Sequence, residues 1–188
     1  MSRTGRICGD CDLCCTVLRV DELAKPARQP CDKLRIDGPG CSIHQTRPSI
    51  CRGYTCAWLQ GSFGDADRPD RLGAVLDLLW RGDRLWLEIH LATPEAWERN
   101  DRLREIADEY REVALVRISD ADRRESPEKP YRILLADGVE QRVEGDRIDL
   151  YRDGQRIESS RVGAAHRVLA WLRRSWSLYR TSRDPGDP

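Results

Sequence analysis

The distribution of cysteine constrains this chain more than any other feature of its sequence. All eight cysteines fall within residues 8–56, and the remainder of the 188-residue chain has none. They form a C-x2-C-x2-C-C run, two single positions and a C-x4-C pair, at Cys8, Cys11, Cys14, Cys15, Cys31, Cys41, Cys51 and Cys56. A two-residue gap lets both thiolates of a turn face one ion at a metal–sulfur distance of about 2.3 Å. The pattern predicts a metal-binding module in which all eight cysteines are candidate ligands.

The choice between metal ligands and disulfides depends on the compartment. No apolar run of the sequence approaches the ~20 residues needed to span a bilayer. Residues 1–6 are basic and lead into the cysteines without an apolar signal segment. We therefore predict a cytoplasmic protein without a membrane partner, whose thiols are kept reduced. Clustered cysteines there favour metal, whereas the alternative, a disulfide-stapled secreted module, requires export without a visible signal.

The charge of the chain bears on its partners. Lys+Arg and Asp+Glu each number 32, so the formal net charge is zero, and the two signs are interleaved along the chain. This argues against a continuous electropositive face for nucleic acid or anionic lipid. The predicted partners are metal ions, and the sequence defines no protein partner or substrate.

Apolar residues divide the chain into two parts. Residues 1–64 carry few large apolar side chains, and a segment of that size rarely builds a sufficient core unaided. Metal coordination can supply the missing stabilisation, because it couples folding to ligand binding. Residues 61–69 are rich in Gly and Asp, and we place a boundary there. We expect a cysteine-rich metal-chelating module over residues 1–64 and an α+β region over residues 65–188.

Three local elements are expected in the first part. Residues 16–20 are predicted to form a short strand, and residues 33–45 a hairpin around a Gly-Pro-Gly turn. Thr46, with a proline two residues later, predicts a helix start in which Thr is the cap. This would place Cys51 on a short helix and Cys56 just beyond it.

The second part alternates strands with a helix. Apolar residues 72–79 and 85–91 are separated by Arg-Gly-Asp, which predicts a hairpin. Thr93, followed by Pro and Glu, predicts a helix start. The apolar face of that helix repeats at i, i+3, i+4 and i+7 from Leu103. Residues 113–118 follow as a strand, so the strand–helix–strand order predicts a parallel crossover.

Two further hairpins and a last helix complete the prediction. Residues 131–143 and 147–158 each contain an Asp-Gly turn between apolar strands. Residues 119–130 are expected to form an exposed loop, and residues 160–179 a helix with an apolar stripe. The expected fold class is α+β, with a small cysteine-rich, metal-stapled N-terminal module packed with a C-terminal mixed sheet and two longer helices. Five tryptophans are expected in the core: Trp80, Trp86, Trp97, Trp171 and Trp176.

The cysteine pattern resembles that of the YkgJ-like cysteine-cluster family, whose shared region is the CxxCxxCC zinc- or iron-chelating domain. The resemblance is firm over residues 8–75 and weak over the rest of the chain. It rests on an ordered set of matching blocks, namely the run of residues 8–15, Cys31, residues 40–44 (Gly-Cys-Ser-Ile-His), residues 47–56 (Arg-Pro-Ser-Ile-Cys-Arg-Gly-Tyr-Thr-Cys) and residues 68–73 (Arg-Pro-Asp-Arg-Leu-Gly).

The resemblance implies that the chain chelates zinc or iron. The iron could be bound as an iron–sulfur cluster such as 4Fe-4S. The resemblance assigns no activity. Flagellin lysine-N-methylases look similar over the cysteine region, which implies an alternative function as a related iron–sulfur enzyme. No glycine-rich loop for S-adenosylmethionine follows an early strand of this sequence, so the methylase activity does not transfer on the cysteines alone. A metal-stapled protein-interaction module is a further alternative, and whether the chain is an enzyme stays open.

The number of thiolates allows several arrangements. Eight thiolates can form two four-sulfur sites, one cubane cluster with spare cysteines, or one site with several free thiols. Cys14 and Cys15 are neighbours, and successive side chains in an extended chain point apart, so we expect them to serve different ions. C-x2-C turns occur in both zinc and iron–sulfur sites, and the spacing leaves both metals open.

Four residues that lie among the cysteines are further candidates for a role at the site. His44 follows Cys41 by three positions and is either a ligand, a group that supports a ligand, or a plain hairpin residue. Arg47 and Arg52 either donate hydrogen bonds to thiolates or a substrate anion, or lie on a solvated helix face. Tyr54 lies two residues before Cys56.

Overall fold

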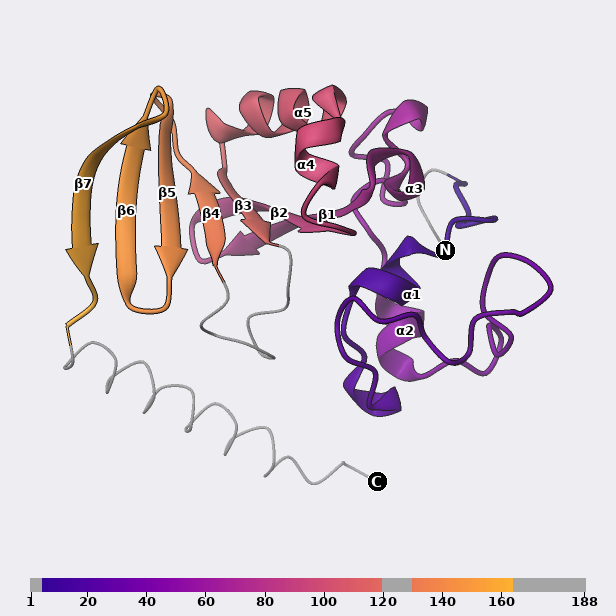
Figure 1. The fold of residues 1–188 in the computed structure, drawn as a ribbon. Coiled ribbons are helices and arrows are strands. Elements are labelled where there is room, and N and C mark those ends of the chain that lie inside the picture. The colour runs from indigo at the N-terminus through magenta and orange to yellow at the C-terminus, as the bar shows by residue number, and fades with distance from the viewer. Residues whose placement is uncertain (1–4, 120–129, 164–188) are drawn as a thin grey trace.

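The structure is a computed structural model that describes residues 5–119 and 130–163. Seven strands form one sheet in the order β1-β2-β3-β4-β5-β6-β7, so strands that follow one another in the chain are neighbours in the sheet (Figure 1). β2 and β3 are parallel, and the other five neighbouring pairs are antiparallel. The predicted α+β class with a mixed sheet is confirmed.

β1 (Ala74–Arg81) and β2 (Arg84–Leu91) form the first predicted hairpin. Its turn contains Gly82 at a φ of 65°, a left-handed conformation that glycine adopts without a Cβ penalty. The hairpin begins later than expected, because Leu72 ends a short preceding helix, α3 (Pro69–Leu72).

Two helices, α4 (Ala96–Arg99) and α5 (Asp101–Arg111), connect β2 to β3 (Leu115–Ser119). The predicted parallel crossover is therefore confirmed. The single helix expected from Thr93 is wrong, because Asn100 is extended and interrupts it. The side-chain oxygen of Asn100 accepts from the Leu103 N–H at 3.2 Å. Asn100 thereby caps a new helix, since Asn satisfies an N–H group that has no partner within the helix.

The remaining strands are β4 (Tyr131–Leu134), β5 (Val139–Glu144), β6 (Arg147–Arg152) and β7 (Gln155–Arg161). Both predicted Asp-Gly hairpins are confirmed. Residues 160 and 161 end β7, so a helix beginning at residue 160 is wrong. The rest of that predicted helix, from residue 164 onward, and residues 120–129 of the predicted loop lie outside the described residues.

The core lies between α5 and one face of the sheet. Leu103, Ile106 and Ala107 of α5 are fully buried, as their periodicity predicted. The sheet contributes its alternate residues to the same cluster, among them Leu76, Leu87, Ile89, Val116 and Ile118. Residues Ala57, Trp58 and Phe63 also belong to this cluster, so the chain before residue 65 packs into the core of the sheet.

The tryptophans follow the core prediction only in part. Trp97 is buried, and Trp86 is half-buried. Trp80 is 72% exposed, so its placement in the core is wrong. The burial of β1 falls off toward its turn, and Trp80 lies at that end of the strand. The other two expected core tryptophans are among the residues that the structure does not describe.

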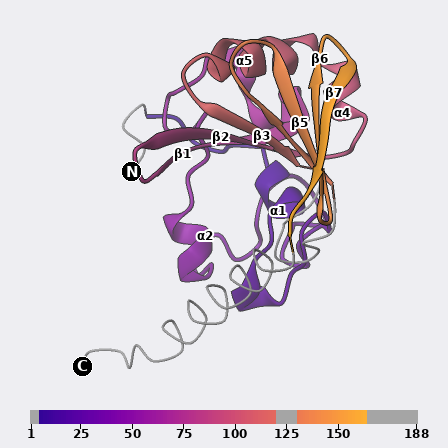
Figure 2. The ribbon, with the colours of Figure 1, turned by 90° about the vertical axis from the view of Figure 1, so that its left-hand side faces the viewer.

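The cysteine-rich segment consists of short helical turns joined by loops. These turns are α1 (Leu13–Val17), η1 (Asp21–Leu23), α2 (Ser49–Gly53) and η2 (Asp65–Asp67). α1 lies against β1. Figures 1 and 2 show α1 and α2 on one side of the β1–β3 part of the sheet and α5 on the other. The helices that carry Cys14, Cys15 and Cys51 therefore lie on the side of the sheet opposite the helical crossover.

The strand predicted over residues 16–20 is wrong. The Leu18 N–H donates to the Cys14 carbonyl at 3.1 Å and closes α1. The only extended pairing of this segment in the described chain is an isolated bridge between Val20 and Lys25. β-Branched residues favour strands, but this preference depends on a partner strand, and among the described residues 16–20 pair only through the Val20–Lys25 bridge.

The predicted hairpin of residues 33–45 is present in reduced form. Its one bridge joins Leu34 and Cys41, with a hydrogen bond from the Arg35 N–H to the Gly40 carbonyl at 2.9 Å.

The helix start predicted at Thr46 is wrong in its cap. α2 begins at Ser49, and no side chain of the adjoining residues caps it. Instead, the carboxylate of Glu22 accepts from Ser49 Oγ at 2.9 Å and from the Ile50 N–H at 3.0 Å. The cap is thus supplied by a residue distant in sequence. Cys51 lies on α2, as predicted.

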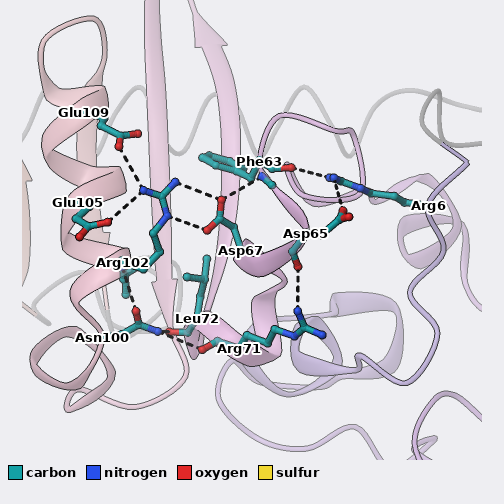
Figure 3. Close-up of polar contacts among 12 residues, drawn as sticks. Arg6, Phe63, Asp65, Asp67, Arg71, Leu72, Asn100, Arg102, Glu105 and Glu109 are labelled. Carbon is teal, nitrogen blue, oxygen red and sulfur yellow. Dashed lines mark hydrogen bonds and ion pairs between the residues drawn. The ribbon is translucent and has the colours of Figure 1, made fainter.

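A buried ion pair joins η2 to α5. Arg102 Nε donates to Asp67 Oδ1 at 2.9 Å, and the Gly64 N–H donates to Asp67 Oδ2 at 3.1 Å (Figure 3). Asp67 is 3% exposed. Arg102, followed by burial and the Gly64 N–H, determines the pKa of Asp67, which is lowered from its ordinary value. The carboxylate is therefore charged and fully partnered in the folded protein.

A second anchor holds the start of the chain on the same segment. Arg6 donates to the Trp58 carbonyl at 2.8 Å and to the Phe63 carbonyl at 2.7 Å, and pairs with Asp65 (Figure 3). Its guanidinium also lies 5.0 Å from the centre of the Trp58 ring.

Replacing Asp67 by Asn is expected to lower the free energy of unfolding by about 1–3 kcal/mol. The single amide oxygen cannot accept from both Arg102 and Gly64 as the two carboxylate oxygens do, so a hydrogen bond to the charged group is lost. The charged form stabilises the fold above about pH 4, the ordinary carboxyl range, and this contribution is lost as the pH falls through the lower folded pKa. Urea denaturation between pH 3 and 7 should therefore show a difference from wild type that shrinks in acid.

Asp65→Asn is the matched control, because Asp65 is on the same turn but its side chain is 88% exposed. An exposed pair contributes about 0–1 kcal/mol. Equal losses for the two variants, or a difference that does not change with pH, would contradict this account of Asp67.

Candidate metal centre

All eight candidate cysteines lie in the described chain, and all are free thiols. Cys8 is exposed and the other seven are half-buried. Among the described residues, no group of three or more His, Cys, Asp or Glu side chains is arranged so that it could hold a metal ion. The structure thus identifies which thiols are neighbours, rather than a formed coordination sphere.

The segment that carries the cysteines has almost no core. Of residues 5–56, all of which the structure describes, only Val17 and Lys25 are buried. Apolar burial is the main favourable term in folding, so this segment lacks the usual source of stability. The need for an additional stabilising element in the first part of the chain stays a prediction.

The first cysteine turn is fixed beside α3. The Cys11 N–H donates to the Cys8 carbonyl at 2.9 Å, which closes the turn. Arg68 Nη1, just before α3, pairs with Asp10 inside the turn at 2.6 Å. α1, which carries Cys14, lies against both α3 and β1. Three cysteines of the run are therefore held at one end of β1.

Cys56 is held at the same strand by the residues on either side of it. The Ala57 N–H donates to the Leu76 carbonyl of β1 at 2.9 Å. Tyr54 Oη donates to Asp77 Oδ1 of β1 at 2.8 Å. The last cysteine therefore returns to the strand against which α1 packs, 41 or more residues after the run in sequence.

A second set of contacts links Cys15 to Cys31 and Cys41. The Cys31 N–H donates to the Cys15 carbonyl at 3.1 Å, and the Leu34 N–H donates to the Cys31 carbonyl at 3.1 Å. Leu34 in turn is bridged to Cys41. The Glu22 cap of α2 places Cys51 beside the loop that joins Cys15 to Cys31.

Burial and neighbouring groups shift the pKa of six of the thiols. Burial raises the pKa of Cys56, and the charges of Cys8, Asp77 and Cys11 raise it further. Burial likewise raises the pKa of Cys51, where the further contributions come from Cys15, Cys31 and Cys41. The pKa values of Cys8 and Cys11 are raised mainly by burial as well. A half-buried thiolate of this kind gains stability from a nearby cation.

Cys14 and Cys15 form a hydrogen-bonded pair. The Cys14 thiol donates to the Cys15 sulfur, which raises the pKa of Cys14 and lowers the pKa of Cys15 to about 7. Cys8 and Cys11 add to the rise at Cys14, whereas Lys25 and Arg47 favour the thiolate of Cys15. The two adjacent cysteines thus have different surroundings.

Backbone amides donate to two of the sulfurs. Those of Leu13 and Asp70 donate to Cys11, and that of Leu59 donates to Cys56. Hydrogen bonds of this kind favour the charged thiolate, which is the form that binds metal. The donor set, eight free thiols with amide and cationic support, fits a thiophilic metal.

Of the other predicted site residues, Arg47 is the one whose charge acts on the thiols. Its charge opposes the rise that burial causes in the pKa of Cys8, and adds to the lowering of the pKa of Cys15 that begins with the Cys14 hydrogen bond. Its Nη1 is within hydrogen-bond distance of Nε2 of the exposed His44. Arg52 is exposed and donates to the Arg47 carbonyl at 2.9 Å. Arg47 therefore adjoins the thiols, while Arg52 supports the loop.

Sequence reasoning missed Lys25. It is 5% exposed, and its Nζ donates to the carbonyls of Thr16 at 2.9 Å, Pro26 at 3.0 Å and Leu18. A cation at the C-terminal end of α1 satisfies carbonyls that the helix leaves without partners. The sequence did contain one signal that could have pointed to Lys25. The chain has only three lysines among 32 basic residues, and two of them lie between the cysteines.

A polar network on the sheet was also missed. Asp77 and Glu88 of neighbouring strands lie 3.4 and 3.7 Å from His90 Nε2. Arg117 of β3 lies 3.5 Å from Glu88, and both are buried. Tyr54 joins this network to the cysteine segment through Asp77. The residues are dispersed in sequence and meet only through strand register, so no local pattern could indicate them.

No helix in the described parts of the chain is long and apolar enough to cross a membrane. No protein-family model matches the chain, and no curated protein or solved structure matches it. The fold and the thiol-rich segment therefore define a class only broadly: an α+β protein with a mixed sheet and eight free cysteines in the segment that precedes it.

Proposed function

We propose that the chain is a metal-binding protein of the YkgJ-like kind, which chelates zinc or iron through its eight cysteines. The observation that carries the proposal is the combination of eight free thiols with a segment of 52 residues in which only two residues are buried. Such a segment needs a stabilising element, and thiolate–metal bonds contribute directly to folding.

The side chains around the thiols support this function. Lys25 and Arg47 place positive charge beside Cys15, and amides donate to Cys11 and Cys56. These groups offset the negative charge that several thiolates accumulate around an ion. Bound zinc supplies structural cross-links, and an iron–sulfur cluster supplies one-electron transfer. Both suit a cytoplasm that keeps thiols reduced, which is where we place the protein.

Purification without oxygen, followed by elemental analysis and an absorption spectrum, tests the proposal. We expect zinc with no visible absorption, or iron and sulfide with visible absorption that is lost on oxidation. Hard ions such as magnesium are not expected, because thiolates select softer metals. Metal-free protein that is fully folded over residues 5–56 would overturn the proposal.

A further inference from the structure

We propose that a cavity beside the Leu34–Cys41 bridge binds the carboxylate or phosphate group of a small molecule. The cavity has a volume of about 370 Å³ and is lined by Arg35 and by residues 41–46. Small-molecule sites commonly measure about 300–1,000 Å³. A free ion would fill only a small part of this volume, so the expected ligand is a molecule that carries the anionic group. The inference goes beyond the proposed metal binding and assigns no part in the anion site to a thiol.

Backbone hydrogen bonds build the cavity from the reduced hairpin of residues 33–45. The Arg35 N–H donates to the Gly40 carbonyl at 2.9 Å and holds the two arms of the hairpin together. The Thr46 N–H donates to the Ile43 carbonyl at 2.9 Å and closes a turn at the end of the second arm. Arg35 from the first arm and the turn at the end of the second therefore line the same cavity.

The positive charge in this cavity has no acidic counterpart. No acidic side chain lines the cavity, and no Asp or Glu occurs between Asp37 and Asp65 in the sequence. The exposed guanidinium of Arg35 has no hydrogen-bond or ion-pair partner among the described residues, whereas nearby Lys33 pairs with Asp32 at 2.7 Å. The planar donors of a guanidinium match two oxygens of a carboxylate or a phosphate. Arg35 is therefore the residue that we expect to bind the anionic group.

His44 supplies a second donor to the cavity. Its Nε2 lies within hydrogen-bond distance of Arg47 Nη1. A guanidinium can only donate, so Nε2 is the acceptor and the ring carries its proton on Nδ1. This Nδ1–H has no partner among the residues that the structure describes. The ring therefore offers a hydrogen-bond donor to a ligand, which suits an anion better than a cation.

The two hydroxyl groups of the lining are already engaged. Ser42 Oγ and Thr46 Oγ1 each donate to a backbone carbonyl of the same hairpin, at 2.9 and 3.5 Å. Their protons are thus used within the protein. The donors that remain for a ligand are the side chains of Arg35, His44 and the exposed Gln45. Several donors without a carboxylate among them favour an oxyanion.

Protection of arginines in the wild-type protein, as purified, tests the proposal without a variant. Phenylglyoxal modifies accessible guanidinium groups, and mass spectrometry of peptides reads each arginine separately. Inorganic phosphate and acetate are the probes, one for each anionic group, with chloride at equal ionic strength as the control. We expect one or both probes to slow the modification of Arg35 in a saturable manner, and to leave the exposed Arg84 at the start of β2 unaffected. The probe that protects identifies the group that the cavity binds.

Two variants measure the contribution of Arg35. Arg35→Gln removes its charge and its paired donors, so equilibrium dialysis with the labelled probe should give an affinity about 10- to 100-fold weaker than wild type. Arg84→Gln removes one positive charge from an exposed site in β2 and is the matched control, which should bind as wild type does. The metal content of the three proteins should be equal, since neither arginine is a candidate ligand.

Modification of Arg35 that neither phosphate nor acetate slows more than chloride does would overturn the proposal. Equal weakening in Arg35→Gln and Arg84→Gln would also overturn it, because net charge alone would then explain the binding. Neither result changes the metal content of the wild-type protein, so a failure of this inference is distinguishable from a failure of the proposed function.

Discussion

Removing the metal that we propose the cysteines bind is expected to unfold residues 5–56 while β1–β7 stay folded. The reason is the distribution of burial, since the cysteine segment buries two residues and the sheet carries most of the core. Structural zinc contributes about 10–16 kcal/mol to the folding of small metal-bound domains. This is comparable with the total stability of about 5–15 kcal/mol of an ordinary domain. Without that contribution the segment cannot offset its conformational entropy.

Amide hydrogen exchange read by mass spectrometry provides the measurement. Peptides from residues 5–56 should exchange as an unfolded chain once a chelator has removed the metal, and peptides from β1, β2 and α5 should keep their protection. The same chelator saturated with zinc beforehand is the control, because it cannot extract metal. Unchanged protection of residues 5–56 in demonstrably metal-free protein would contradict the role that we assign to the cysteines.

Leu103→Ala in α5 is expected to lower the free energy of unfolding of the sheet region by about 2–5 kcal/mol. Leu103 is fully buried in the cluster between α5 and the sheet. Truncation removes its apolar contacts and leaves a cavity, because close-packed neighbours relax only in part. Urea denaturation followed by circular dichroism measures the loss.

Leu79→Ala is the matched control for this substitution. It deletes the same atoms from β1, at a site that is 40% exposed, and should cost about 1 kcal/mol or less. Metal content should be unchanged in both variants, since neither residue lies among the thiols. Losses of equal size would show that α5 does not seal the core as the structure indicates.

These two results would separate two sources of stability in one chain. The sheet region depends on apolar packing, and under the proposed function the cysteine segment depends on bonds to metal. The Tyr54–Asp77 hydrogen bond and the packing of Trp58 and Phe63 join the two parts. Damage to either part should nevertheless remain mostly local, because each part has its own source of stability.

Local sequence patterns predicted a helix face or a turn correctly where residues a few positions apart determine its conformation. The hairpin turns at Gly82, Gly138 and Gly154 were predicted from residues that adopt positive φ, and each φ is positive in the structure. The buried face of α5 was predicted from its periodicity. Such signals succeed because a turn or a helix face is determined by residues a few positions apart.

The same patterns failed where a distant residue decides the conformation. Thr46 has the sequence context of a cap, but Glu22 supplies the cap of α2. Residues 16–20 have β-branched side chains but no partner strand, and α1 ends among them. The helix expected from Thr93 breaks because Asn100 caps α5 and donates to the Leu72 carbonyl at 3.1 Å.

The sequence by itself determined the chemistry available to this protein: eight thiols within 49 residues, and an apolar core supplied by the rest of the chain. Only the tertiary structure decided which thiols are neighbours, how Lys25 and Arg47 lie beside them, and which strand Tyr54 bonds. The physical reason is distance along the chain. Residue types and short spacings are written in the sequence, whereas the approach of Cys56 to Cys8, or of Cys51 to Cys15, depends on packing that involves the whole fold.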